Sequence, residues 1–415
     1  MFNVIILGVV SLLTDISTEM VYPLLPLFLT TRLGATPAVV GLIEGIAESL
    51  ASLLKVFSGY LADLFGRKKP LAILGYGSSA VGKVVLYLAG SWPAVLVARV
   101  IDRFGKGIRT APRDALIADS STPETRGRAY GLHRALDTLG AATGVLLAYY
   151  FITAYKGDYG HVFLWAMMPA FLGMAVLFLA RETRVEADET AVGAGGPGDA
   201  GGGAGAGAGD YTGSEERTDP HSIPAVRRRK PLSLQWSKLD RRLRGFLIVV
   251  FLFALGNSSN QFLILRAGDL GFGPAKVLLV YFLYNVVYSV LSYPAGRLSD
   301  RIGRKTLLVA GYAMYGLVYL GFAFATAPWH VWTLFSIYGA YIALTEGVEK
   351  ALVADIAPVP LRATTIGLHA TLVGVGLLPA SLLAGFLWNL FGPQATFLFG
   401  GMMGLLAAVG IWVVV

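Results

Sequence analysis

The chain has 415 residues, of which 55% are hydrophobic and only 14% are charged, and its mean hydropathy is +0.62. Soluble domains carry roughly 25% charged residues, so this composition excludes an ordinary soluble protein and indicates a protein of the lipid bilayer. The net charge of +8 does not indicate nucleic acid as a partner, because the Lys and Arg residues lie between apolar stretches, and the absence of cysteine excludes disulfides, thiolate chemistry and iron–sulfur clusters.

Apolar stretches long enough to cross a bilayer predict an all-α integral membrane protein with twelve transmembrane helices. The spans of the first half are residues 3–31, 37–61, 71–89, 93–117, 127–153 and 160–181. Those of the second half are residues 243–265, 275–298, 306–325, 329–352, 361–389 and 392–415. Residues 1–14 lack the basic n-region of a signal peptide, so we expect them to remain in the first helix. The predicted domains are six-helix bundles in residues 1–181 and 241–415.

Between the two halves, residues 182–240 have the composition of a disordered cytoplasmic linker. The Gly/Ala run from Gly201 to Gly209 cannot bury enough apolar surface to offset the entropy of ordering the chain. The basic cluster Arg227–Lys230 in this linker has two interpretations. It is a topology anchor, which we favour, or a site for anionic lipid.

The basic residues also predict the orientation of the helices. An even number of spans places both termini on one side, and the basic loops fall on that side. These loops contain Arg67, Lys68, Lys69, Arg126, Arg128, Arg227–Lys230, Arg301, Arg304 and Lys305. We therefore expect a multi-pass protein of the plasma (inner) membrane with both termini in the cytoplasm.

Two sequence elements of the first half recur in the second. The pattern G-x-L-x-D-x-x-G-R-K at Gly59–Lys68 returns at Gly296–Lys305, and Ala115–Asp119 returns as Ala351–Asp355 at nearly the same spacing. Two matches at one spacing indicate a duplicated six-helix unit in parallel orientation. The two bundles should therefore be related by a pseudo-twofold axis.

The repeated pattern resembles the signature loop of the major facilitator superfamily, which lies between helices two and three and again between helices eight and nine. The resemblance covers the whole membrane domain and implies the fold and transport activity of that family. In the family the aspartate meets a helix of the other half and a basic residue, and this latch holds the cytoplasmic side shut. The resemblance implies latch residues Asp63, Arg67 and Asp119, repeated as Asp300, Arg304 and Asp355, with tight turns or close helix approach at Gly59, Gly66, Gly296 and Gly303. The alternative is that these loops only set topology.

Several charged residues lie inside the predicted spans. Asp15 lies about 18 Å into the first helix, near the bilayer centre, and lipid exposure would cost several kcal/mol. Helix four carries a stripe of acids and bases, and helix five faces it with Gly140 and Gly144, which allow close packing. The candidate proton or substrate pathway is Asp15, Glu19, Glu44, Glu48, Arg99, Asp102, Arg103, Arg134, Asp137, Asn257, Gln261, Asn285 and Glu346. The alternative for each acid is a structural ion pair.

Arg99–Gly107 is similar to the arginine motif of superfamily drug/proton antiporters, although helix five lacks the proline of their Gly-Pro element. The run Gly105–Asp114 resembles a bacterial permease branch of unassigned substrate. We therefore expect a secondary active transporter that works by alternating access between the halves. No P-loop pattern is present, so an ion gradient should drive it.

Proton coupling is favoured over sodium, and efflux over uptake by symport. A membrane sensor or enzyme on the same fold is the alternative from another class, but the sequence offers neither a nucleophile with a base nor a cluster of metal ligands. We expect no cofactor and a monomer whose partners are protons, the bilayer and a small-molecule or ion substrate. The acids favour a cation and the helix-four arginines an anion, so the sequence leaves the substrate charge open.

Overall fold

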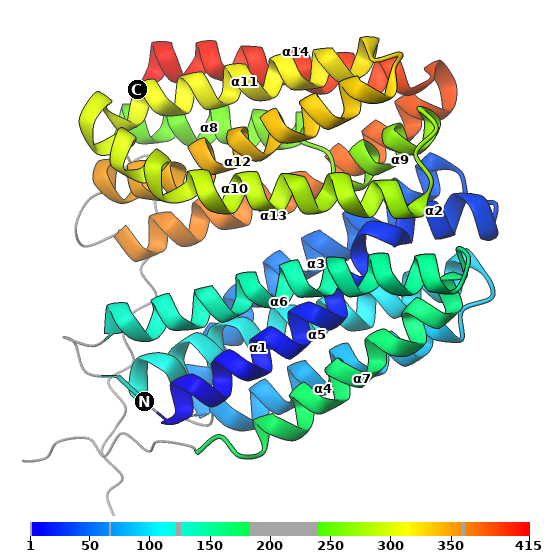
Figure 1. Ribbon diagram of the computed structural model, residues 1–415. Helices are drawn as coiled ribbons and strands as arrows, with labels where there is room; N and C mark the ends of the chain where they lie inside the picture. The colour runs from blue at the N-terminus through cyan, green and yellow to red at the C-terminus, as the bar shows by residue number, and fades with distance from the viewer. Residues whose placement is uncertain (1, 66–67, 122–125, 182–239, 358–361) are drawn as a thin grey trace, which may run out of the picture. The chain divides into compact units, whose positions relative to one another are not determined.

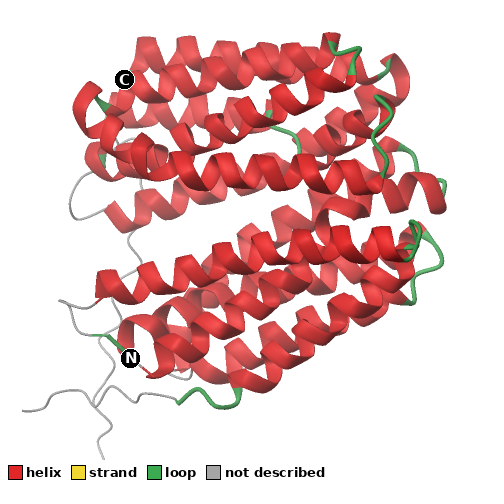
Figure 2. Cartoon of the chain, in the orientation of Figure 1, coloured by secondary structure: helices red, strands yellow, loops and turns green. Residues whose placement is uncertain are grey.

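The computed structural model describes residues 2–65, 68–121, 126–181, 240–357 and 362–415, except for the side chains of residues 56, 59–65, 126–128, 350, 354 and 362–364. Every regular element in these ranges is a helix (Figure 2). The predicted linker, with Arg227–Lys230, lies outside the described residues apart from Asp240. The Asp240 carboxylate accepts a hydrogen bond of 3.3 Å from the backbone N–H of Arg242, so this residue caps the first helix of the second half.

The described helices confirm the twelve predicted spans (Figure 1). The first half comprises α1 (Phe2–Val21), η1 (Tyr22–Leu24), α2 (Leu25–Leu27), η2 (Phe28–Arg32), α3 (Pro37–Phe65), α4 (Lys68–Tyr87), α5 (Trp92–Asp119), α6 (Arg126–Ala154) and α7 (Tyr159–Leu177). The second half comprises α8 (Arg241–Gly256), α9 (Gln261–Asp269), α10 (Pro274–Ile302), α11 (Arg304–Phe324), α12 (Pro328–Ile356), α13 (Arg362–Phe391) and α14 (Pro393–Val414). Within these ranges, nine segments are long and apolar enough to cross a membrane, and the more polar α4, α5 and α12 complete the twelve.

Two of the predicted spans are interrupted helices, which the apolar windows did not predict. In the first span, Pro23 and Pro26 lack backbone N–H donors, and the α-helix gives way to a 3₁₀ turn and then a π-helical turn. The seventh span breaks between α8 and α9 at Asn257–Asn260, whose side chains compete with helical hydrogen bonds. The Tyr315 hydroxyl donates a 3.0 Å hydrogen bond to the Gly256 carbonyl and so satisfies an acceptor at this break.

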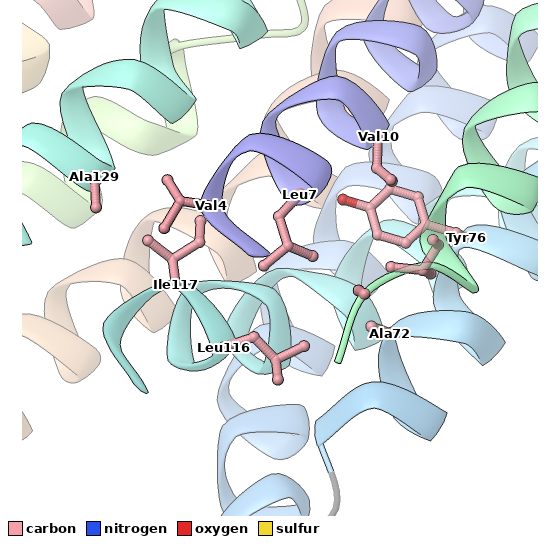
Figure 3. Close-up of a cluster of buried hydrophobic side chains, with 10 residues drawn as sticks. Val4, Leu7, Val10, Ala72, Tyr76, Leu116, Ile117 and Ala129 are labelled. Atoms are coloured by element: carbon pink, nitrogen blue, oxygen red, sulfur yellow. The ribbon is translucent and has the colours of Figure 1, made fainter. Parts of the chain in front are cut away.

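Each half packs mainly on itself. In the first half α1 packs on α6 and α7, and α5 packs on α3 and α4; in the second half α11 packs on α12 and α14. Figure 3 shows the apolar cluster where α1 begins, with Val4 and Leu7 against Ile117 and Ala129. We call this the termini end of the helices, because α1 begins and α14 ends here (Figure 1).

The two halves meet closely along α3 and α13. Glycine allows this approach: a Cβ atom on Gly385 would lie only 2.7 Å from the Cα of Ala38. Further along, the Ser49 hydroxyl donates a 2.8 Å hydrogen bond to the Gly374 carbonyl. The seam therefore runs from the beginning of α3, opposite the termini end, to its middle.

A side chain at Gly385 should open this seam. We expect Gly385→Val to lengthen the distance between spin labels at the exposed positions Thr36 and Leu390 by about 2 Å or more. The control is Gly367→Val in the same helix, where an added Cβ meets nothing within 4 Å. Equal distances in the two variants would contradict the role of Gly385.

Candidate functional site

A polar cavity of about 310 Å³ lies between the halves in the middle of the helices. It falls within the range of small-molecule sites. Its lining is Thr18, Glu19, Tyr22, Glu48, Arg103, Lys106, Asn257, Ser258, Ser259, Asn260, Tyr281, Tyr338, Ile342 and Leu377. Both helix interruptions contribute to this lining, through Tyr22 in the first span and Asn257–Asn260 in the seventh. The breaks therefore bring polar side chains and backbone groups without helical hydrogen bonds to the centre of the molecule. In continuous helices these backbone groups would be bonded within the helix.

Beside the cavity, three acids and three bases form a buried ion-pair cluster. Arg99 donates two hydrogen bonds to the Glu44 carboxylate, from Nε at 2.9 Å and from Nη2 at 2.8 Å. This fork geometry is the strongest form of ion pair, and the Glu44 side chain is only 1% exposed. One turn further along both helices, Arg103 Nε lies 3.1 Å from Glu48 Oε1.

The third pair of the cluster joins Asp102 to Lys83, whose ammonium lies 3.6 Å from the carboxylate. Lys83 is on α4 and was not among the predicted site residues, although a lone lysine inside an apolar span is a detectable signal. Gly82 lets α4 come this close, because a Cβ there would lie 3.0 Å from the Asp102 backbone nitrogen. The first bundle thus neutralises internally most of the charged stripe on α5, which is the fourth predicted span. Of the six clustered residues, only Glu48 and Arg103 also line the central cavity.

A pair of neighbouring carboxyl groups joins α1 to α6, one turn of α1 before the cavity residue Glu19. The Asp15 side chain, on α1, lies close enough to the Asp137 side chain, on α6, for the two carboxyl groups to interact. The predicted glycines make this contact possible, since a Cβ on Gly140 would lie 2.9 Å from the Cα of Leu12. Asp137 is in turn 3.5 Å from the guanidinium of Arg134.

Arg134 also connects the two halves. Its guanidinium donates a 3.1 Å hydrogen bond to the Tyr288 hydroxyl on α10, and this hydroxyl donates a 2.6 Å hydrogen bond to the Glu346 carboxylate on α12. We call these three residues the inter-bundle bridge. The bridge lines a second cavity, of about 480 Å³, that extends along α10 and α12 toward Asp300 at the termini end. A smaller cavity shares Ile342 with both, so three neighbouring cavities lie between the centre and that end.

The predicted latch residues are only partly described. Arg67 and Gly66, and the side chains at Asp63 and Gly59, lie outside the described residues. Asp119 pairs with Lys68 at 2.5 Å. In the second copy, Arg304 pairs with Asp355 and donates a 2.7 Å hydrogen bond to the Ala351 carbonyl. Asp300 lines the second cavity.

The signature glycines have different roles. Gly303 has φ = +90° and makes the turn between α10 and α11, as expected for this residue. An added Cβ at Gly296 meets nothing within 4 Å, so no other helix approaches this residue closely in the structure.

The remaining predicted pathway residues take three different positions. Asn257 lines the central cavity. Gln261 is fully buried, and its amide donates a 3.2 Å hydrogen bond to the Tyr22 carbonyl, which ties the two interrupted spans together. Asn285 donates a 2.9 Å hydrogen bond back to the Tyr281 carbonyl of its own helix. Sequence reasoning missed Tyr22 and Tyr288, because a tyrosine in a membrane helix carries no signal that distinguishes a site residue from a packed one.

Comparison with known proteins agrees with this architecture. The chain is 34% identical over 413 residues to an uncharacterized MFS-type transporter of Methanocaldococcus jannaschii, a match that covers 98% of this chain and 93% of that protein. It is also 31% identical over 137 residues to multidrug resistance protein MdtH of Yersinia pestis, which is 33% of this chain and 34% of that one.

The crystal structure of nucleoside transporter NupG superposes with a TM-score of 0.76 at 11% identity, covering 100% of this chain and 99% of that one. This likeness concerns the fold alone. The family model of the Major Facilitator Superfamily matches residues 7–265 and 246–415. With its two six-helix halves and a polar cavity between them, the chain belongs to the major facilitator superfamily and is a multi-pass secondary transporter.

Proposed function

We propose that this transporter exports a small solute in exchange for protons by alternating access. The observation that carries the proposal is the Asp15–Asp137 carboxyl pair, which Arg134 connects to the inter-bundle bridge. Two neighbouring buried carboxyl groups repel each other when both are ionised, and they can hydrogen-bond only if one of them carries a proton. The pair is thus a proton site in contact with a residue that joins the halves.

Proton release from the pair changes the forces on Arg134. Two carboxylates without a shared proton repel each other and attract the guanidinium toward Asp137, away from Tyr288 and Glu346. When the proton returns, Arg134 favours the bridge to the second half. Protonation therefore stabilises the conformation that contains the bridge, and deprotonation weakens it.

The conformation described here has neighbouring cavities from the centre toward the termini end and a packed seam of α3 and α13 at the opposite end. The basic loops predict that the protein lies in the inner membrane with both termini in the cytoplasm. The termini end then faces the cytoplasm, and this conformation is the inward-open form. The predicted latch residues Asp63, Arg67 and Asp119, with Asp300, Arg304 and Asp355, then hold this end shut when the carrier turns outward. We propose that the monomer carries out this cycle.

Export follows from the order of these steps. The protonated carrier opens to the cytoplasm, a cytoplasmic solute displaces the proton, and the loaded carrier turns outward. The partial similarity to MdtH, a multidrug resistance protein, agrees with export. Uptake by symport would instead need solute and proton to bind together.

Proteoliposomes with imposed pH gradients test the direction of coupling. Vesicles are incubated in a bacterial metabolite extract, washed, and their contents are identified by mass spectrometry. Exchange predicts that solute accumulates when the lumen is acidic, since protons leave as solute enters. Accumulation only in vesicles with an alkaline lumen would establish symport and overturn the proposal, and no gradient dependence would exclude proton coupling.

Removing the Tyr288 hydroxyl should break the inter-bundle bridge and so reduce proton-driven transport. Tyr288→Phe breaks both hydrogen bonds between Arg134 and Glu346 while keeping the ring, and hydrogen bonds to charged groups contribute about 1.5–3 kcal/mol each. We expect gradient-driven accumulation to fall about tenfold or more. The matched control is Tyr293→Phe on the same helix, whose ring is 74% exposed. Equal activity of the two variants would contradict a role for the bridge.

A further inference from the structure

The central cavity presents one acid and one base that are not used in ion pairs. Glu48 and Arg103 in its lining pair with each other at 3.1 Å. The two remaining charged residues of the lining are Glu19, on α1, and Lys106, on α5. Within the part of the chain that the structure describes, neither forms an ion pair within 4.0 Å. The cavity therefore has one available group of each sign.

Among the described residues, one oxygen of the Glu19 carboxyl is without a partner, although the side chain also interacts with Tyr281. The Oε2 atom of this carboxyl is buried and has no hydrogen-bond partner among the described residues. Buried polar atoms are nearly always hydrogen-bonded in native proteins, so an orphan at the wall of a cavity indicates a ligand that donates to it. Lys106 offers the complementary chemistry, because an ammonium group is a donor and never an acceptor.

The rest of the lining is neutral and, apart from Ile342 and Leu377, polar. The break between α8 and α9 provides the amides of Asn257 and Asn260, and aromatic rings come from Tyr22 and Tyr281, whose centroids lie 6.1 Å apart. Amides and hydroxyls donate and accept hydrogen bonds without preferring either charge. The preference for charge therefore depends on Glu19 and Lys106.

We propose that the transported solute is a small zwitterion, with a cationic amine toward Glu19 and a carboxylate or similar anion toward Lys106. The inference rests on the proposed transport function and names the substrate class of the same cavity. A simple anion would leave Glu19 unpaired, and a simple cation would leave Lys106 unpaired; each leaves a desolvated charge without compensation. The conflict between acids favouring a cation and arginines favouring an anion disappears, because the cluster of Glu44, Arg99 and their neighbours is neutralised internally.

Thermal-shift measurements on the purified full chain test the charge class with three probe pools built on the same skeletons. These are free α- and ω-amino acids, their N-acetyl derivatives, which are anions, and their amides, which are cations. A ligand that binds the folded state raises the midpoint temperature. For the wild-type protein we expect a shift with the zwitterions and not with the other pools.

The variants should change this preference in opposite directions. Glu19→Gln should weaken zwitterion binding tenfold or more, which is about 1.4 kcal/mol, and admit the N-acetyl anions. Lys106→Met should weaken it similarly and admit the amide cations. Asp269→Asn and Lys276→Met remove exposed charges outside the cavity and should change nothing. Glu19→Asp and Lys106→Arg keep the charges and should keep the zwitterion preference, which separates lost charge from lost folding.

The proposal is wrong if the wild-type protein is stabilised by the anion or cation pool, or by no pool, or if both charge-removing variants keep the wild-type preference. These outcomes are distinct from failure of the proposed function. Zwitterion binding without proton-driven accumulation overturns only proton exchange, whereas proton-driven transport of a simple anion overturns only the zwitterion.

Discussion

Replacement of Arg99 by Met should lower the free energy of unfolding by about 3–5 kcal/mol, because it leaves a charged group buried without its partner. The Glu44 side chain is 1% exposed, and its carboxylate accepts two hydrogen bonds from the guanidinium group of Arg99. Neither water nor a neighbouring base can replace them without rearrangement of α3 and α5. We expect a loss of several degrees in the midpoint of heat inactivation, measured as decay of the monodisperse size-exclusion peak.

A second substitution should restore most of the lost stability. In the double variant Glu44→Gln, Arg99→Met both charges are gone, and replacing a whole buried pair is often nearly neutral in stability. Arg304→Met is the control for an exposed pair, since its partner Asp355 is 55% exposed and such pairs contribute about 0–1 kcal/mol. If Arg99→Met proves as mild as Arg304→Met, the cluster is not the structural centre of the first bundle.

The fold could be predicted from the sequence because its signals are local. A bilayer requires long apolar helices, and duplication leaves repeated motifs, so both the twelve spans and the two halves were found. The interruptions were missed, although Pro23, Pro26 and the Asn257–Asn260 run are local signals too. Mean hydropathy over a window does not register the loss of individual backbone hydrogen bonds.

The site was harder to predict because pairing depends on how each helix is rotated about its axis. Spacing alone placed Glu44 and Glu48 on one face, but not which base each would meet. In the structure Arg99 and Arg103 neutralise them, which leaves Glu19 as the acid of the cavity lining without an ion pair among the described residues. The substrate charge could not be read from the sequence because it depends on which charges remain after internal pairing.

Replacement of Asp137 by Asn should abolish the response of the carrier to pH. An amide cannot release a proton or attract Arg134, so the variant should remain in the conformation with the inter-bundle bridge. We expect a loss of proton-driven accumulation of about a hundredfold, since the step that the proton drives is removed. Asp158→Asn is the control: Asp158 lies before α7, where a hydrogen bond with His161 lowers the pKa of its carboxyl. It stays ionised between pH 5 and pH 8 and should contribute nothing to the response.

Distances between spin labels, measured by double electron–electron resonance, test the coupling of protonation to conformation without a known substrate. The chain has no cysteine, so Leu132→Cys on α6 and Leu298→Cys on α10 provide two unique labelling positions near the termini end. Our account predicts longer distances at acidic pH, shorter ones at alkaline pH, and long distances at every pH when Asp137→Asn is added. A distance distribution that responds to pH equally with and without Asp137 would contradict the account.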